Sequence, residues 1–280
     1  MKLSVMTLPL LPMPDIPGLK REETMQEKPS LFNIYSQVKA AGIDYLDISS
    51  MDFQYGGEGA VLDAMEKTAT KCSCYLAFIS APMPTEAGNA AAIAQGKEAV
   101  DQALRLGTRV MRFVPAGYED AVAVMSRQQL ADAFISVLKP VVEYAGAQGV
   151  TVVIEDAPHR EFPMCSQAEL SYLLRSVPGL RLVYDSGNML FAGEEPIPYY
   201  EHFQDVTAHG HLKDVAKGEN GQLMECTHGS GMVDFKTILA RMKENHFEGT
   251  LAIELSPDFT GKTSVKERVQ NAAAYFTSLI

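Results

Sequence analysis

Residues 150–156 read VTVVIED, and three similar stretches follow: LRLVYDSGN at 180–188, VTAHGHLKD at 206–214 and GTLAIELSPD at 249–258. Each is a run of β-branched and apolar residues, which is typical of a buried parallel strand. Each run also ends near one residue of a type that binds metals. These residues are Glu155, Asp185, His211 and Glu254, spaced by 30, 26 and 43 positions. Because about 30 residues make one strand–helix repeat, four successive strands are predicted to deliver one such side chain each to the same rim.

The same alternation of short strands and longer helices extends along the whole chain. Strands are predicted at residues 2–8, 43–49, 72–80, 108–115, 150–157, 181–186, 206–213 and 250–255. Helices are predicted at residues 30–41, 90–106, 127–147 and 264–279. We expect Pro140 to kink or split the third of these helices and Thr263 to cap the last. Eight such units without a break in composition predict an α/β fold, a single (β/α)8 TIM barrel over residues 1–280.

The length of 280 residues suits this fold, since one such barrel needs about 250. A doubly wound open sheet is the structural alternative, but it usually carries a glycine-rich phosphate loop after its first strand. Here residues 8–18 read LPLLPMPDIPG, which is rich in proline and contains no GxGxxG pattern. We expect this segment to be an irregular loop at the mouth of the barrel, either a plain linker or a lid over the substrate.

Charge and composition exclude several classes of partner. The chain has 24 Lys and Arg against 35 Asp and Glu, a formal net charge of −11, which argues against a nucleic-acid partner. It has no signal-peptide pattern and no run of the roughly 20 apolar residues that cross a bilayer, so no membrane partner is predicted. Of the four cysteines, Cys72 and Cys74 form a CxC pair that is a weak zinc signal. Free thiols in a reducing cytoplasm are the preferred interpretation, and the predicted location is cytoplasmic.

Strand alternation predicts where the metal-binding residues point. Side chains two apart share one face of a strand, so all four can face the barrel lumen near its C-terminal mouth. Three carboxylates and one imidazole around one point make a site for a hard or borderline divalent cation. His209 shares the face of His211, and we expect it to pack behind the site rather than to bind the metal. Lys213 either holds a substrate oxygen or pairs with a carboxylate.

The ordered segments IED, DSGN, HGHLKD, GSGMVDF and IEL between Val150 and Pro257 resemble those of the xylose isomerase-like barrels. More narrowly, they are similar to the sugar (or sugar-phosphate) isomerase/epimerase branch, which includes ketose 3-epimerases. The resemblance implies a single divalent ion, most often Mn²⁺ with Mg²⁺, Co²⁺ or Zn²⁺ as alternatives. Its implied ligands are Glu155, Asp185, His211 and Glu254. The resemblance also implies that Glu155 and Glu254 act as acid and base on opposite faces of the reacting carbon.

A second set of residues is compared with that family one by one. Glu161 lies six positions after Glu155, where the epimerases have a glutamate that contacts substrate or metal-bound water. Asn188 stands where many members have a histidine, and Lys217 where ketose epimerases often have an arginine. With Lys213, these are the candidate substrate-binding residues, and a solvated loop position is the alternative for Glu161, Asn188 and Lys217. The glycines of Gly229–Gly231 either receive an anion or make a tight turn.

These expectations lead to one principal functional hypothesis. The chain is predicted to be a metal-dependent isomerase or epimerase of a small sugar or polyol carbonyl compound, working through an enediolate. A lyase on the same scaffold is the main alternative, either of the inosose dehydratase type or one that cleaves a 3-oxo-C-glycoside. An abasic-site endonuclease shares the fold but uses a histidine-rich zinc cluster, and this chain has only six histidines. A non-catalytic sugar-binding protein also stays open, as does association of the chain into a homo-oligomer.

Overall fold

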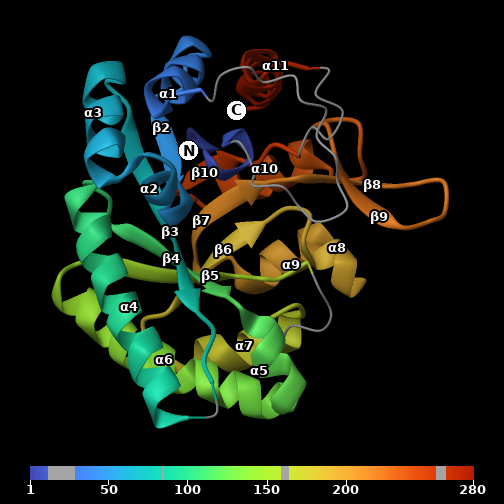
Figure 1. The fold of residues 1–280 in the computed structure, drawn as a ribbon. Helices are drawn as coiled ribbons and strands as arrows, with labels where there is room; N and C mark the ends of the chain where they lie inside the picture. Colours follow the sequence, from blue (N-terminus) through green and yellow to red (C-terminus); the bar gives the residue numbers. More distant parts are fainter. Residues whose placement is uncertain (12–28, 84, 159–163, 257–262) are drawn as a thin grey trace.

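The computed structural model describes residues 1–11, 29–83, 85–158, 164–256 and 263–280, and it forms a closed barrel of eight parallel strands (Figure 1). The ring order is β1-β10-β7-β6-β5-β4-β3-β2, so strands that follow one another in the chain also lie side by side. The strands are β1 (Lys2–Met6), β2 (Tyr45–Ser49), β3 (Lys71–Ser80), β4 (Val110–Ala116), β5 (Thr151–Glu155), β6 (Arg181–Asp185), β7 (Thr207–Leu212) and β10 (Thr250–Ile253). All eight predicted strands are confirmed, and so is the predicted (β/α)8 barrel.

Helices surround this barrel (Figure 1). They are α1 (Leu31–Ala40), α2 (Ser50–Gly56), α3 (Glu58–Thr68), α4 (Glu86–Arg105), α5 (Tyr118–Val124), α6 (Arg127–Ala147), α7 (Gln167–Ser176), α8 (Met189–Ala192), α9 (Pro196–Phe203), α10 (Phe235–Glu244) and α11 (Val265–Thr277). Within the described ranges, no helix combines the length and the apolar character that crossing a bilayer requires.

Three helix predictions need correction. Helix α6 runs unbroken past Pro140, so it is not split there, and buried Leu138 and Val141 near the proline hold it to the core. A kink at Pro140 stays a prediction. Helix α4 begins four residues earlier than expected, at Glu86, where the Thr85 side chain accepts from the Gly88 amide. The N-cap of α11 is Ser264 and not Thr263, since the Ser264 hydroxyl accepts from the Glu267 amide.

The core has two parts. The larger part packs the outward faces of the strands against the helices, and its biggest fully buried side chains include Tyr35, Phe113 and Phe134. The smaller part fills the lumen with Met6, Cys74, Leu76, Val153 and Val183. The lumen is therefore a packed interior, and its polar residues sit above and between these apolar side chains.

A two-stranded hairpin follows β7 and was not predicted. It consists of β8 (Asp214–Lys217) and β9 (Leu223–Cys226), and it projects away from the barrel (Figure 1). The chain then returns through Gly229–Gly231, whose first and third amides donate to Asp214 Oδ2 at 2.8 and 3.0 Å. A Cβ at Gly231 would lie 2.1 Å from Asp214 Oδ1. Of the two interpretations of these glycines, the structure supports the tight turn.

The proline-rich segment is only partly described. Residues Leu8–Leu10 form one turn of 3-10 helix, and Leu10 and Leu11 are buried in the core. The remainder, from residue 12 to residue 18, lies outside the described residues. A lid role for this segment stays a prediction.

Candidate metal centre

Four adjacent strands bring the four predicted ligands to one point at the C-terminal mouth of the barrel. Glu155 ends β5, Asp185 ends β6, His211 lies in β7, and Glu254 directly follows β10. One nitrogen or oxygen atom from each lies within 4.8 Å of the others. Asp185 and His211 are fully buried, and only 14% of the Glu254 side chain is exposed. Each of the four ligands is held in place by the apolar strand that precedes it, because that strand is buried in the barrel wall.

The polar atoms of this group fit a metal ion. Glu155 Oε1, Asp185 Oδ2, His211 Nδ1 and Glu254 Oε2 are all buried, and each lacks a hydrogen-bond partner among the described residues. Nδ1 of His211 lies 2.5 Å from Glu155 Oε1 and 3.3 Å from Glu254 Oε2, but neither pair forms an aligned hydrogen bond. A cation bound between these four atoms would give each of them a partner. Carboxylate oxygens together with an imidazole nitrogen are ligands that suit a divalent cation.

The electrostatics of the group also call for positive charge. Burial raises the pKa of Asp185 to about 7, with Glu254 and Glu155 adding to the rise and Lys213 opposing it. Burial alone would lower the pKa of His211, but the charge of Glu155 raises it well above the ordinary value. The surrounding carboxylates therefore favour a proton, or another cation, at this point.

Lys213 supplies one fixed positive charge at the edge of the group. Its ammonium lies 2.8 Å from Glu254 Oε1 and 3.6 Å from Asp185 Oδ2, and it donates to Asn188 Oδ1 at 2.9 Å. Of the two roles considered for Lys213, the structure supports pairing with a carboxylate. Asn188 is also held by hydrogen bonds within the protein. Its backbone N–H donates to Asp185 Oδ1, and its side-chain NH2 donates to the Asp156 backbone carbonyl. Asn188 therefore orients Asp185 and Lys213.

Two charged residues that the sequence did not single out complete the surroundings. The Arg112 guanidinium, from β4, pairs with Glu155 Oε2. Burial works to raise the pKa of Glu155, but Arg112 and His211 hold it below the usual range. Glu225, from the hairpin strand β9, lies 3.6 Å from the Lys213 ammonium. A lone arginine in the apolar run VMRFVPA was the available signal for Arg112, whereas Glu225 had none because the hairpin was not predicted.

Comparisons with known proteins agree with this architecture. A family model for the xylose isomerase-like TIM barrel matches residues 35–277. The chain belongs to this family. Among curated relatives, the inosose dehydratase of Lacticaseibacillus casei is 29% identical over 93 residues, and the match covers 28% of this chain and 30% of that protein. The inosose dehydratase of Clostridium tetani is 30% identical over 91 residues, with the same coverage of 28% and 30%. The similarity therefore spans less than a third of each relative's length.

Two solved structures share the fold over almost their whole length. The IolI protein with a bound zinc atom has a TM-score of 0.78 at 18% identity, covering 100% of this chain and 98% of that one. The 3-keto-D-glucoside 4-epimerase YcjR of E. coli has a TM-score of 0.73 at 12% identity, covering 99% of each chain. At these identities the likeness shows the fold alone.

The remaining residues predicted for this family's site lie in different places. Lys217 is exposed at the outer end of β8, where it is opposite Leu223 in the strand pairing, and no ion pair joins it to the four-ligand group among the described residues. Glu161 lies outside the described residues, so its role stays a prediction. His209 Nε2 hydrogen-bonds Asp47 Oδ2 at 2.6 Å and is not one of the four converging ligands, so its place behind the metal site stays a prediction. Asp156 is buried beside Glu155, and burial with the charge of Asp185 raises its pKa well above normal, which favours a neutral carboxyl.

Proposed function

We propose that this protein is a metal-dependent enzyme that removes a proton beside the carbonyl of a small sugar or related polyol, giving an enediolate. The observation that carries the proposal is the convergence of four unsatisfied, buried ligand atoms, two of them on glutamates that can also accept a proton. Enediolates form readily only where negative charge on oxygen is stabilised in a site that excludes water. A buried group at the mouth of a barrel is such a site.

Glu155, Asp185, His211 and Glu254 would hold one divalent ion, with Mn²⁺ the first candidate and Mg²⁺, Co²⁺ and Zn²⁺ the alternatives. When bound, such an ion would act as a Lewis acid that stabilises charge on substrate oxygens. Asp185 takes no other part in the reaction, because Gly187 and Asn188 amides hold its second oxygen at 2.7 and 2.8 Å. Glu155 and Glu254 remain as the groups that move protons.

The two glutamates approach from different sides of the mouth. Glu155 comes from β5 and Glu254 from the end of β10, with β6 and β7 between them in the ring. Each has a cation at its outer oxygen, Arg112 for Glu155 and Lys213 for Glu254. Both carboxyl groups are ionised, since burial is outweighed by these cations and by His211, which keep both pKa values low. One glutamate can therefore take the proton from one face of the carbon. Because both glutamates start ionised, the proton that returns to the opposite face must first be passed to the second glutamate, from the first glutamate or from water.

Elimination of water is the second candidate function, and it fits the same site at least as well. The curated relatives with sequence similarity are inosose dehydratases. The two outcomes share the first proton transfer and differ only in whether a β-hydroxyl then leaves the enediolate.

Deuterium exchange would test the shared step and separate the two outcomes. The purified protein, loaded in turn with Mn²⁺, Mg²⁺, Co²⁺ and Zn²⁺, would be incubated in D₂O with free ketoses, sugar phosphates and inososes. Exchange of a substrate C–H with an inverted centre identifies an epimerase, and loss of water identifies a dehydratase. His211→Ala is the matched control, since it keeps both glutamates but lacks one proposed ligand. Exchange that is equal in the control, or absent with every ion and substrate, refutes the proposal.

Other features stay predictions of the sequence. These are a single domain over residues 1–280, a small-molecule substrate as the main partner, no nucleic-acid partner, a cytoplasmic location and possible association into a homo-oligomer.

A further inference from the structure

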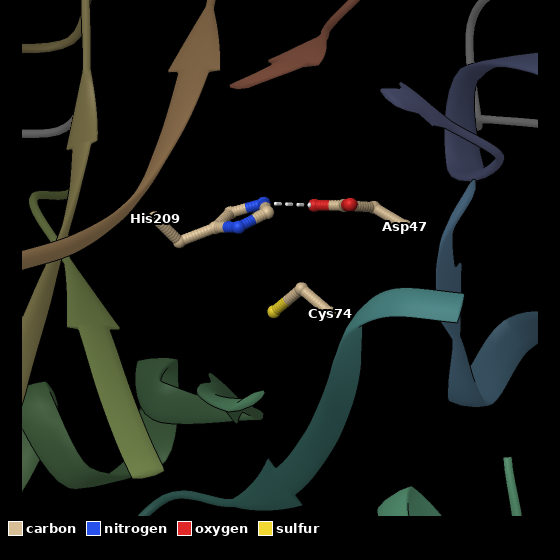
Figure 2. A group of neighbouring side chains, drawn as sticks. All are labelled: Asp47, Cys74 and His209. Atoms are coloured by element: carbon tan, nitrogen blue, oxygen red, sulfur yellow. Dashed lines mark hydrogen bonds and ion pairs between the residues drawn. The ribbon is translucent and has the colours of Figure 1, made fainter. Parts of the chain in front are cut away.

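A second group of metal-binding residue types lies deeper in the lumen. Figure 2 shows its members, Asp47 from β2, Cys74 from β3 and His209 from β7, pointing toward one another. All three are buried, with at most 1% of any one exposed, and their ligand atoms lie within 4.8 Å of one another. By residue type alone, this group, which we call the Asp47 group, is also a candidate metal site.

Its hydrogen bonds show a different role. Asp47 Oδ1 accepts from the hydroxyls of Ser4 at 2.9 Å and Ser73 at 2.6 Å. Its Oδ2 lies 2.6 Å from Nε2 of His209 and 3.3 Å from Nε2 of His211. Each oxygen of this buried carboxylate thus has two partners. An added ion would have to displace bonds that the protein already makes.

We propose that Asp47 is a positioning residue, a carboxylate that holds the Nε2–H groups of both histidines and thereby leaves the Nδ1 lone pair of His211 for the metal ion. This inference rests on the proposed function, in which His211 is a ligand. An ionised carboxylate can only accept hydrogen bonds, so both Nε2 atoms must carry the proton. A neutral imidazole protonated at Nε2 has its free lone pair on Nδ1. Nδ1 of His211 is the atom that faces the three carboxylates without a partner.

Two irregularities in the sheet build the Asp47 group. In the β2–β3 pairing, Leu46 is opposite Cys72 but Asp47 is opposite Cys74, so Ser73 is an extra residue. In the β6–β7 pairing, Leu182 is opposite Thr207 but Val183 is opposite His209, so Ala208 is extra. Such bulges redirect side chains at the cost of ladder bonds, and they are frequent beside active sites.

The bulges have identifiable consequences. The bulge in β3 puts the Ser73 hydroxyl on Asp47 and separates Cys74, in the lumen, from Cys72, which packs in the helix-side core. With Ser4 and Ser73 on one oxygen and the histidines on the other, the carboxylate cannot rotate without breaking bonds. The ring of His211 is therefore fixed toward the mouth.

Asp47→Asn in the full chain would test the inference. Both Nε2–H groups contact the same oxygen of Asp47, so an amide either turns its NH2 donor toward both of them or offers them only a neutral oxygen. Because the negative charge is lost in either case, we expect Mn²⁺ and Zn²⁺ affinity, measured by competition with a chelator, to fall about 10–100-fold. The matched control is Asp52→Asn. Asp52 is an equally buried carboxylate that accepts from Ser49, Thr7 and Tyr35 and contacts neither histidine. The control should keep wild-type affinity if it folds.

A second readout reports the histidine tautomer directly. Nitrogen-15 spectra of the Zn²⁺-loaded protein should show His211 protonated at Nε2 and bound through Nδ1, and Asp47→Asn should lose this single state. If Asp47→Asn does not fold, Ser73→Ala removes only one bond to the carboxylate and should still weaken metal affinity several-fold. Wild-type affinity together with an unchanged His211 signal in a folded variant overturns the inference, as does coordination through Nε2.

The outcomes also separate this inference from the proposed function. Wild-type protein that binds the ion no better than His211→Ala refutes the proposed function. Loss of binding in His211→Ala with full binding in Asp47→Asn refutes only the positioning role. Two tightly bound ions per chain, one of them lost in Cys74→Ala, would show instead that the Asp47 group is itself a metal site.

Discussion

The candidate metal centre at the mouth of the barrel and the Asp47 group beneath it contain similar residue types. Each combines buried carboxylate with imidazole, and each brings its ligand atoms within 4.8 Å. They differ in their hydrogen bonds. At the mouth, one side-chain atom of each of the four proposed ligands has no hydrogen-bond partner among the described residues, whereas both oxygens of Asp47 have two each.

This difference assigns separate roles to two similar clusters. A buried polar atom without a partner costs about 1–3 kcal/mol, so the upper group is costly unless a cation completes it. The lower group is already complete, and its effect is to orient a ring of the upper one. Satisfaction of the polar atoms, rather than residue type, therefore distinguishes a site that binds an ion from a site that supports one.

The largest expected effect comes from the two glutamates of the upper group. Glu155→Gln and Glu254→Gln each remove a proton acceptor, so we expect kcat/KM to fall by about 10²–10⁴, with a smaller effect on thermal stability. The measurement is steady-state kinetics at confirmed metal content. Glu225→Gln is the matched control, since Glu225 is a carboxylate at the same mouth whose ion pair, within the described part of the chain, is with Lys213. Near-full turnover by both glutamine variants would remove the two-glutamate mechanism.

A smaller loss of kcat/KM is expected from Arg112→Met, which removes the cation beside Glu155. A hydrogen bond to a charged group contributes about 1.5–3 kcal/mol, or roughly 10–150-fold in rate. Because Arg112 keeps the pKa of Glu155 low against burial, its removal should raise that pKa and move the acid limb of the pH–rate profile to higher pH. Arg109→Met is the control, since Arg109 is exposed near the start of β4 and donates to the Gln148 carbonyl. An acid limb at its original pH would contradict the role given to Arg112.

Sequence patterns predicted the barrel and the convergence of the four ligands because both follow from local rules. Apolar runs of strand length at a repeat of about 30 residues determine the ring, and alternation determines which side chains enter the lumen. Arg112, Asp47 and Glu225 were missed for other reasons. Asp47 reaches His211 across 164 positions of sequence, and its partner Ser73 is turned inward only by a bulge that changes the register. A polar bond across the lumen has no local signal.

Metal affinity should depend on pH with a predictable sign. The ion needs Asp185 and His211 unprotonated, and burial raises the pKa of Asp185 to about 7 while Glu155 raises that of His211. Asp185 gains a proton as the pH falls below about 7, and His211, with its pKa raised well above the usual value, already carries one that the ion must displace. Affinity should therefore fall with decreasing pH by about tenfold per pH unit for each proton displaced. Dissociation constants for Zn²⁺ and Mn²⁺ at pH 6, 7 and 8 would measure this slope. Affinity that is flat over this range would mean that the upper group binds its ion without releasing protons.

The smallest effect is expected from Cys74→Ala, which tests the lower group directly. Burial and the nearby charge of Asp47 raise the pKa of the Cys74 thiol well above its usual value, so the sulfur is a neutral neighbour rather than a thiolate ligand. Removing one small buried group should lower the free energy of unfolding by about 1 kcal/mol and leave both turnover and metal content unchanged. Cys72→Ala, at the other buried cysteine of the same strand, is the matched control.

Cobalt substitution gives this test a clear readout. A Co²⁺ ion bound to a thiolate absorbs in the near ultraviolet through sulfur-to-metal charge transfer, and one bound only by oxygen and nitrogen does not. We expect no such band in the wild-type protein, since all four proposed ligands at the mouth lack sulfur. A band that disappears in Cys74→Ala but persists in Cys72→Ala would place an ion in the Asp47 group. The Asp47 group would then bind an ion itself, and the distinction drawn between it and the candidate metal centre above it would be wrong.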